Sequence, residues 1–270
     1  MGPGEPFPAG WWRHVTDERF ERIAAIIGGL DADVVALQEV AFYDVHGEVH
    51  DQPLELARRI GMRVRYAAVH AYTLVEPESG RAVGSATWGN VLLTHEPVRD
   101  GFATGLPVAA DDALVEPAGS DLPLAGVTFA AAPYGTREPR CAVGGTVDPG
   151  SVPVTVIGTH LAYAGGGQRA LQAAALLDMI DERRPPIIVM GDLNASIDAP
   201  ELRHLASAVV DAFDAVGIAA DDPARRSCGP LAIDHVLVRG LRVDDCRVLT
   251  DAGDASDHLP VVATLRAEIG

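Results

Sequence analysis

Short apolar runs that each end in a polar or charged side chain recur along the chain. The clearest run is 187–190, which leads into Gly191, Asp192, Leu193 and Asn194. Alternation along an extended chain places Asp192 and Asn194 on one side and Leu193 on the other. Similar apolar segments adjoin Glu39, His160 and Asp234, and Ser256-Asp257-His258 lies close to the C-terminal end of the sequence. The pattern predicts strands whose ends carry a polar site at one edge of a sheet.

Helical periodicity separates several of these runs. Thr16 is followed by acidic residues and by an apolar face that ends at Gly28-Gly29, which predicts a helix. Further helices are expected at about 54–60, from Gly165 to about Glu182 and at 200–205, and the second of these should turn Leu171, Ala174, Leu177, Met179 and Ile180 towards the core. Further strands are expected at 64–69, 90–94, 127–130, 232–238, 242–249 and 260–265, whereas 209–213 is ambiguous.

Composition indicates one globular domain over 1–270. The 270 residues are 48% hydrophobic and 22% charged, which suits a chain with a substantial core. Residues 100–150 are rich in Pro, Gly, Ala and Asp, and we expect hairpins and long loops there without a separate domain. No apolar stretch is long enough to span a bilayer and no secretory signal is visible, so a cytoplasmic protein is expected.

Charge and cysteine content narrow the function classes. The formal net charge of −17 argues against a broad basic face for nucleic acid, although a divalent cation could supply local positive charge to a nuclease. The three cysteines, Cys141, Cys228 and Cys246, are odd in number and far apart, which argues against a disulfide scaffold and a cysteine-based zinc site.

The polar residues at the strand ends suit phosphate ester chemistry. Carboxylates without thiolates favour a hard cation such as Mg²⁺ or Mn²⁺. An imidazole paired with a carboxylate makes a general acid or base, and an amide with a second imidazole can donate hydrogen bonds to a phosphoryl group. Any one of these residues has a structural alternative, such as a turn or a core histidine. Together they predict hydrolysis of a phosphate ester by an activated water.

Five ordered motifs carry a resemblance to a known superfamily. They are D-V-V-A-L-Q-E, G-T-H-L, G-D-L-N, I-D-H-V and S-D-H-L-P, and they resemble the endonuclease/exonuclease/phosphatase superfamily from about Trp11 to Leu265. That superfamily includes deoxyribonucleases, abasic-site endonucleases, neutral sphingomyelinases and inositol polyphosphate 5-phosphatases. The resemblance implies an α/β fold, a four-layer α/β/β/α sandwich in which two packed mixed sheets are flanked by helices.

The resemblance also implies a metal site and an acid–base pair. Carried over by motif, Glu39 would be the principal metal ligand and Asp257 a second metal contact, with Mg²⁺ or Mn²⁺ as the cofactor. His258, oriented by Asp234, would be the general base, or the proton donor in the reverse sense.

Other positions would act on the phosphate. Asp192 would orient the nucleophilic water, and Asn194 and His160 would stabilise the pentacovalent phosphate. Asn90 and Arg140 resemble substrate-binding positions that line the pocket, although their motifs are less specific.

One departure from the family pattern bears on activity. Members usually begin with a strand that carries an asparagine in a T-x-N pattern, whereas the corresponding place here falls near Ala9, so we expect a first strand that is truncated or divergent. The sequence therefore supports two functions, an Mg²⁺-dependent phosphoesterase acting on a mono- or diester of open class, and a non-catalytic binding or scaffold protein that retains the fold. A zinc hydrolase would require tight histidine spacing such as H-E-x-x-H, which the sequence lacks.

Overall fold

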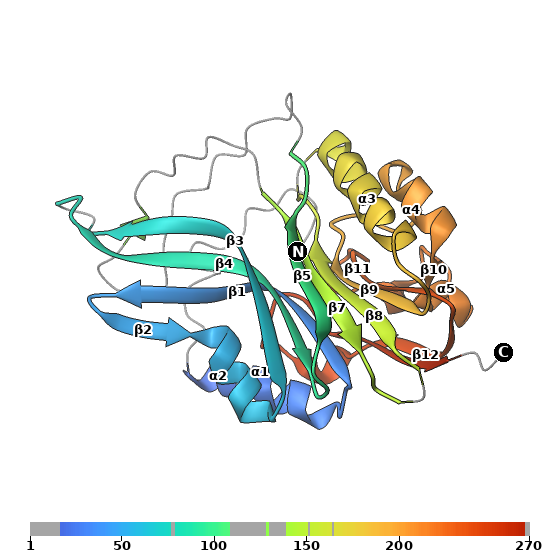
Figure 1. The fold of residues 1–270 in the computed structure, drawn as a ribbon, viewed down its shortest axis with the longest axis horizontal. Helices are drawn as coiled ribbons and strands as arrows, with labels where there is room; N and C mark the ends of the chain where they lie inside the picture. Colours follow the sequence, from blue (N-terminus) through green and yellow to red (C-terminus); the bar gives the residue numbers. More distant parts are fainter. Residues whose placement is uncertain are drawn as a thin grey trace.

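Two large β-sheets pack face to face, and helices cover the outer side of each (Figure 1). The computed structural model describes residues 17–76, 79–108, 128–129, 139–150, 152–163 and 165–267. This arrangement confirms the predicted α/β sandwich of two sheets flanked by helices. The predicted helix start at Thr16 and the divergent first strand near Ala9 lie outside the described residues.

The first sheet has five antiparallel strands in the order β2-β1-β4-β3-β6. Its strands are β1 (Val34–Val45), β2 (Glu48–Asp51), β3 (Arg63–Val75), β4 (Ala82–Thr94) and β6 (Thr128–Phe129). The helices α1 (Asp17–Gly29) and α2 (Gln52–Ile60) cover it, because Phe20 and Leu56 pack with Val91 in one apolar cluster. The carboxylate of Asp51 caps α2 by accepting a hydrogen bond from the Leu54 N–H.

The second sheet has six strands in the order β10-β11-β9-β8-β7-β5. Its strands are β5 (Arg99–Gly105), β7 (Cys141–Val147), β8 (Val154–His160), β9 (Ile187–Asp192), β10 (Val210–Asp211) and β11 (Asp234–Arg239). Strands β8 and β9 run parallel because α3 (Gly166–Asp181) connects them, and the other neighbours in this sheet are antiparallel. The remaining elements are α4 (Arg203–Ala208), α5 (Ala212–Ala215), 3-10 turns at Pro200–Leu202, Pro223–Arg225 and Thr250–Ala252, and a small sheet of β12 (Leu241–Val248) and β13 (Val261–Ala267).

Several predicted strands are longer in the structure than the sequence suggested. Strand β1 continues through Glu39 to Val45, and β3 and β4 extend the expected 64–69 and 90–94 into a long antiparallel pair. The extension of β4 contains alanine, serine and glycine, which give little apolar signal. Pairing with neighbouring strands therefore decides their length.

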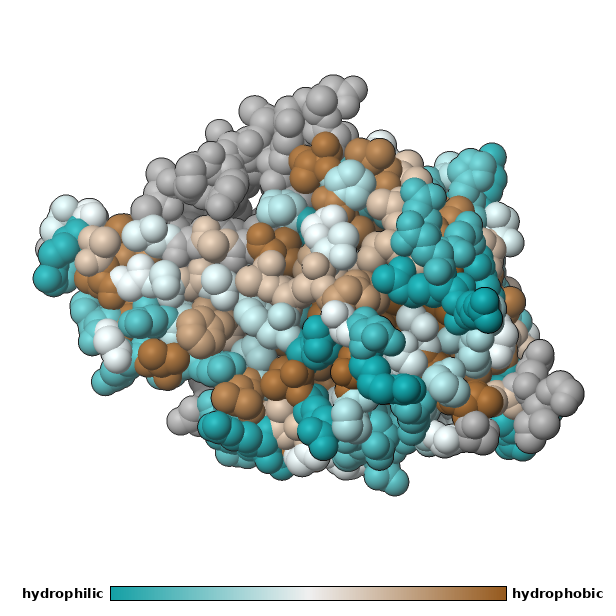
Figure 2. All heavy atoms as spheres, viewed as in Figure 1, coloured by the Kyte–Doolittle hydropathy of each residue, from teal (hydrophilic) through white to brown (hydrophobic). Residues whose placement is uncertain are grey.

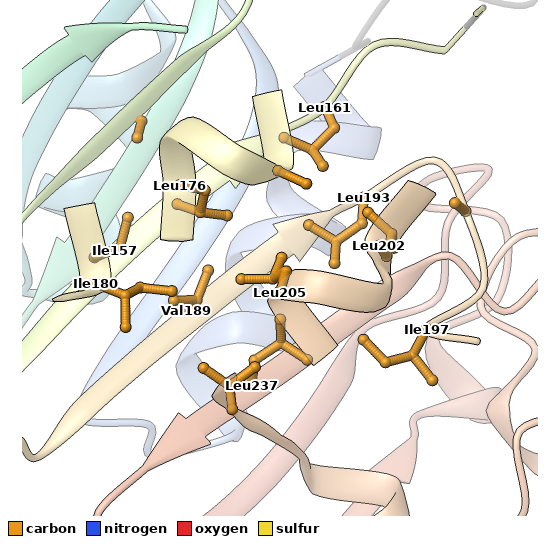
Figure 3. Packing of buried hydrophobic residues seen from close by; sticks show 14 of the residues in the cluster. Ile157, Leu161, Leu176, Ile180, Val189, Leu193, Ile197, Leu202, Leu205 and Leu237 are labelled. Carbon is orange, nitrogen blue, oxygen red and sulfur yellow. The ribbon is translucent and has the colours of Figure 1, made fainter. Parts of the chain in front are cut away.

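The helix α3 packs against the second sheet through a face that differs in part from the predicted one. Leu176 and Ile180 are fully buried and meet Ile157 and Val189 (Figure 3). Leu171, which was expected to face the core, is 41% exposed, and Ala174 is also exposed. The predicted core face of α3 was thus wrong at Leu171 and Ala174. Gln168 and Gln172 are buried on the core face, and because they are polar they do not contribute to the hydrophobic periodicity.

Substitution of Leu176 by alanine tests this packing. We expect Leu176→Ala to lower the free energy of unfolding by about 2 to 5 kcal/mol, because it removes a fully buried side chain and leaves a cavity. Leu171→Ala on the same helix is the matched control and should change it by about 0.5 kcal/mol or less. Urea unfolding followed by circular dichroism measures both, and equal losses would contradict the assigned orientation of α3.

Close approach between strands requires glycine at one point beside the polar strand ends. A Cβ on Gly191, whose φ is +144°, would lie 1.9 Å from the carbonyl oxygen of Thr159 in the neighbouring strand. A side chain there would clash with the backbone of β8. Gly191 therefore permits β9 to deliver Asp192 next to the end of β8.

The described surface is mixed in polarity. On the face seen in Figure 2, hydrophobic residues are scattered among hydrophilic ones, and hydrophilic residues gather towards the side where α3 and α4 lie. Among the described helices, none combines the length and the apolar character that crossing a bilayer would need.

Candidate active site

Three neighbouring strands place their polar residues at one level of the second sheet. His160 ends β8 and pairs in register with Asp192, which ends the parallel strand β9. Asp234 begins the antiparallel strand β11 and also pairs with Asp192. Strand register thus brings together residues that are far apart in the sequence, as the strand-end pattern predicted.

The segment after Asp192 turns sharply and keeps its polar groups in the site. Asn194 has a φ of +51°, and its N–H donates to Oδ1 of Asp192 at 2.7 Å. Its side-chain amide donates to the carbonyl of Leu161 at 2.9 Å and lies 2.9 Å from Nε2 of His160. Leu193 is buried. Asp192 and Asn194 therefore lie together because the chain turns at Asn194, and not because it stays extended as predicted.

The buried guanidinium of Arg140 holds one side of the His160 ring. Its Nη1 lies 3.0 Å from Nδ1 of His160. A guanidinium only donates hydrogen bonds, so Nδ1 accepts from Arg140. Nε2 is 3.3 Å from Oδ2 of Asp192 and 2.9 Å from the amide nitrogen of Asn194. Both ring nitrogens of His160 therefore contact other residues of the site.

Asp192 remains ionised although it is buried. Burial acts to raise the pKa of this carboxyl, but hydrogen bonds from His160 and Asn194, together with nearby positive charge, hold the pKa below its ordinary value. An ionised carboxylate at this position can accept a hydrogen bond from a water molecule.

His258 and Asp234 form a carboxylate–imidazole pair. Nδ1 of His258 lies 2.8 Å from Oδ2 of Asp234, which also accepts a hydrogen bond from the Ser227 hydroxyl at 2.6 Å. Burial acts to lower the pKa of His258, but hydrogen bonds with Asp234 and Cys228 and the negative charges of Asp234 and Asp192 outweigh it and raise the pKa to about 12. The His258 ring is thus protonated at neutral pH. Asp192, Asp234 and His258 also bring one ligand atom each to within 4.8 Å of one another.

The raised pKa of His258 predicts a pH-dependent contribution to stability. A raised folded-state pKa gives stability that is fully present below the ordinary value of 6.5 and is lost as the pH rises towards about 12. In metal-free buffer, the unfolding free energy of the wild type should exceed that of His258→Gln by more at about pH 6 than at about pH 9. Urea unfolding measures the difference, with His204→Gln on an exposed position as the control. A difference that stays constant or grows with pH would contradict the charged pair.

Glu39 lies at an irregularity of β1 in the first sheet. The register between β1 and β4 shifts between Leu37 and Val40, and Glu39 has a φ of +57°, which non-glycine residues seldom adopt. The bulge leaves the Glu39 side chain exposed. Local strain of this kind often accompanies a side chain that is aimed at a functional site.

Asp257 lies within electrostatic range of Glu39. Burial raises the pKa of Asp257, His258 acts to lower it, and the negative charge of Glu39 acts to raise it. Carboxylate oxygens are the ligands that Mg²⁺ and Mn²⁺ prefer. Among the described residues, the two clusters of possible ligand atoms centre on His258 and do not include Glu39, so metal binding by Glu39 stays a prediction.

Asn90 and Arg140 occupy buried positions at the junction of the two sheets. The amide of Asn90 on β4 donates to the carbonyl of Cys141 on β7 at 2.9 Å. Arg140 precedes Cys141 and contacts His160. The structure thus gives both residues a role in holding the site together, and contact with substrate remains a prediction for each.

Sequence reasoning missed two residues beside His258. Ser227 donates to Asp234, and Cys228 contacts the His258 ring. Both lie in a short turn without a recognisable motif, so no local signal marks them. The nearby His235 is instead structural, because it is buried and bonds to Asp211 and to the carbonyl of Ala195.

The site is separate from a hollow at the opposite end of the second sheet. That hollow has a volume of about 700 Å³ and is lined by Phe102, Thr155 and Arg183 among others. Thr155 lies at the start of β8, whereas His160 lies at its end. None of the candidate active-site residues lines this hollow.

Comparison with known proteins gives a family match and several similar structures. The model of the Endonuclease/Exonuclease/phosphatase family matches residues 16–258. An endonuclease/exonuclease/phosphatase structure from Beutenbergia cavernae has a TM-score of 0.64 and 27% identity, and the match covers 94% of this chain and 67% of that chain. No curated protein sequence matches.

More distant structures share the fold at lower identity. The human nocturnin catalytic domain with bound sulfate has a TM-score of 0.59 and 18% identity, over 93% of this chain and 87% of that one. The mannosyl-6-phosphatase of Bacteroides thetaiotaomicron has a TM-score of 0.57 and 16% identity, over 92% and 90%. The family match extends over most of the chain and spans the strands that carry Glu39, His160, Asp192 and Asp234. The chain therefore belongs to the endonuclease/exonuclease/phosphatase family.

Proposed function

We propose that this protein is a divalent-metal-dependent phosphoesterase that hydrolyses a phosphate mono- or diester by attack of water. One observation carries the proposal: the Asp234–His258 pair lies beside the ionised Asp192, with their ligand atoms within 4.8 Å of one another. An acid–base pair and a water-orienting carboxylate at one point are the groups that hydrolysis of a phosphate ester needs.

The protonation state of each side chain determines its proposed role. Asp192 accepts a hydrogen bond from the attacking water and orients it. His258, held by Asp234, carries a proton at neutral pH and can donate it to the leaving-group oxygen. His160 and Asn194, whose side chains lie 2.9 Å apart, donate hydrogen bonds to the phosphoryl oxygens.

The cation would be held by Glu39 and Asp257. When bound there, Mg²⁺ or Mn²⁺ supplies positive charge that offsets the negative charge of the phosphate ester. The exposed Glu39 and the half-buried Asp257 leave this part of the site open to solvent and to substrate.

We propose a phosphate ester other than duplex DNA as the substrate. The net charge of −17 opposes the approach of a long polyanion, whereas one phosphate group needs only local positive charge. The activity of the mannosyl-6-phosphatase from Bacteroides thetaiotaomicron belongs to that protein, because a likeness at 16% identity supports the fold alone.

Metal-dependent hydrolysis of bis-p-nitrophenyl phosphate tests the proposal. We expect turnover by the wild type to stop with a chelator and to return with Mg²⁺ or Mn²⁺. Glu39→Ala should need at least about tenfold more metal for half of the maximal rate, because one carboxylate ligand is lost. The monoester p-nitrophenyl phosphate, tested in parallel, separates phosphatase from phosphodiesterase activity.

Glu48→Ala is the matched control, because Glu48 is an exposed glutamate on the neighbouring strand β2. It should leave the metal dependence unchanged. Wild-type turnover that does not rise above the chelated background with either metal, for either ester, would overturn the enzyme proposal and favour a non-catalytic binding protein.

A further inference from the structure

A thiol lies beside the imidazole of the candidate active site. Cys228, Asp257 and His258 each bring one possible ligand atom to within 4.8 Å of the others. Nε2 of His258 is 3.5 Å from Oδ2 of Asp257. All three side chains are partly exposed, so an ion from solvent can reach them.

The turn around Cys228 holds its thiol in place. The Cys228 N–H donates to the carbonyl of Leu231 at 3.1 Å, and the Leu231 N–H donates back to Cys228 at 2.9 Å. Gly229 between them has a φ of +54°, which closes the turn. The Leu259 N–H donates to the carbonyl of Ser227 at 2.7 Å, so the turn is tied to the segment that carries Asp257 and His258.

A thiolate, an imidazole and a carboxylate suit Zn²⁺ better than Mg²⁺. Zinc binds sulfur at about 2.3 Å and nitrogen or oxygen at about 2.0 to 2.2 Å, so tetrahedral ligand atoms lie about 3.3 to 3.7 Å apart. The separation of 3.5 Å between His258 and Asp257 already fits, and the 4.8 Å limit for the set requires only small adjustments. Mg²⁺ prefers oxygen ligands and gains little from the thiol.

The second nitrogen of His258 supports the same assignment. Nδ1 is bound to Asp234, which turns Nε2 towards Asp257. Zinc-binding histidines are commonly held in this way, with one ring nitrogen on a carboxylate and the other on the metal. The Asp234–His258 pair is therefore oriented for a metal as well as for proton transfer.

We propose that Cys228, Asp257 and His258 form a zinc site, and that Zn²⁺ bound there inhibits the phosphoesterase. On binding, the Cys228 thiol and Nε2 of His258 each release a proton to solvent, Zn–S and Zn–N bonds form, and hydrating waters leave the ion. Nε2 of His258 is then no longer available for proton transfer. The site itself stands on the geometry alone, whereas the inhibition rests on the proposed function.

Cobalt binding to the full chain tests the site without reference to activity. Titration with Co²⁺ should produce the near-ultraviolet absorption of a cobalt–thiolate bond, and Zn²⁺ should remove it. Cys228→Ser should abolish the absorption, and Cys246→Ala should keep it, because Cys246 is a buried thiol whose pKa burial raises to about 12. Cys141 is also buried, and burial raises its pKa to about 11.

Affinity and alkylation complete the test. In competition with a chromogenic chelator, Cys228→Ser should weaken Zn²⁺ binding at least about tenfold. In the wild type, Zn²⁺ but not Mg²⁺ should slow alkylation of Cys228 by iodoacetamide, as read by mass spectrometry. Unchanged affinity in Cys228→Ser, no cobalt–thiolate absorption, or alkylation of Cys228 that Zn²⁺ does not slow would each overturn the site.

Inhibition of hydrolysis by Zn²⁺ tests the inhibitory role separately from the proposed function. With Mg²⁺ present, Zn²⁺ should inhibit the wild type, and at least about tenfold more Zn²⁺ should be needed to inhibit Cys228→Ser. A cobalt–thiolate signal in a protein without turnover would support the zinc site and overturn the phosphoesterase. Turnover that Zn²⁺ inhibits equally in the wild type and in Cys228→Ser would support the phosphoesterase and overturn the inhibitory role of the site.

Discussion

Replacing His258 by alanine is expected to lower the rate of phosphate ester hydrolysis by at least about a hundredfold, the scale of a lost acid–base group. The ring is fixed by Asp234 at 2.8 Å and is protonated at neutral pH, so its loss removes both a proton donor and a positive charge. Initial rates with bis-p-nitrophenyl phosphate at saturating Mg²⁺ measure the effect.

The control for this substitution is His204→Ala, which removes an exposed histidine on α4. It should keep the wild-type rate. Circular dichroism of both variants checks that the fold is retained. Full activity in a folded His258→Ala protein would exclude His258 from proton transfer.

Asp192→Ala is expected to lower the rate by at least about a hundredfold as well, because no other group would orient the water. The carboxylate is buried between β8 and β11, and it also bonds to the Asn194 N–H. Its removal therefore leaves His160 and Asn194 without their common partner. The same hydrolysis assay at saturating metal and substrate measures the fall in kcat.

Asp198→Ala is the matched control, since Asp198 is an exposed carboxylate six positions further along the chain. Its kcat should equal that of the wild type. If Asp192→Ala instead raised only KM, Asp192 would belong to substrate binding and its assignment to the attacking water would be wrong.

Part of the site could be predicted because strand geometry is regular. The polar ends of apolar runs marked Asp192, His160 and Asp234, whereas the predicted extended alternation to Asn194 is replaced by a turn. The structure brings these residues to one edge of one sheet. The α/β sandwich was implied by the order of motifs and is confirmed.

Other features depended on contacts that no local pattern encodes. The core face of α3 was misplaced because Gln168 and Gln172 are buried there, which a hydrophobic period does not register. The continuation of β1 beyond Glu39 depends on pairing with β4 across a bulge. Pairing energy comes from the neighbouring strand, so the sequence of β1 alone does not reveal where it ends.

The sequence by itself determined the fold class, the family resemblance and the strand ends that carry carboxylates and imidazoles, because these follow from short-range periodicity and motif order. Only the tertiary structure decided that Arg140 contacts the ring of His160 and that Cys228 lies beside His258. These pairs are 20 and 30 positions apart in the sequence, and no spacing rule links them. They meet because sheet register and a tight turn fix the positions of side chains in space.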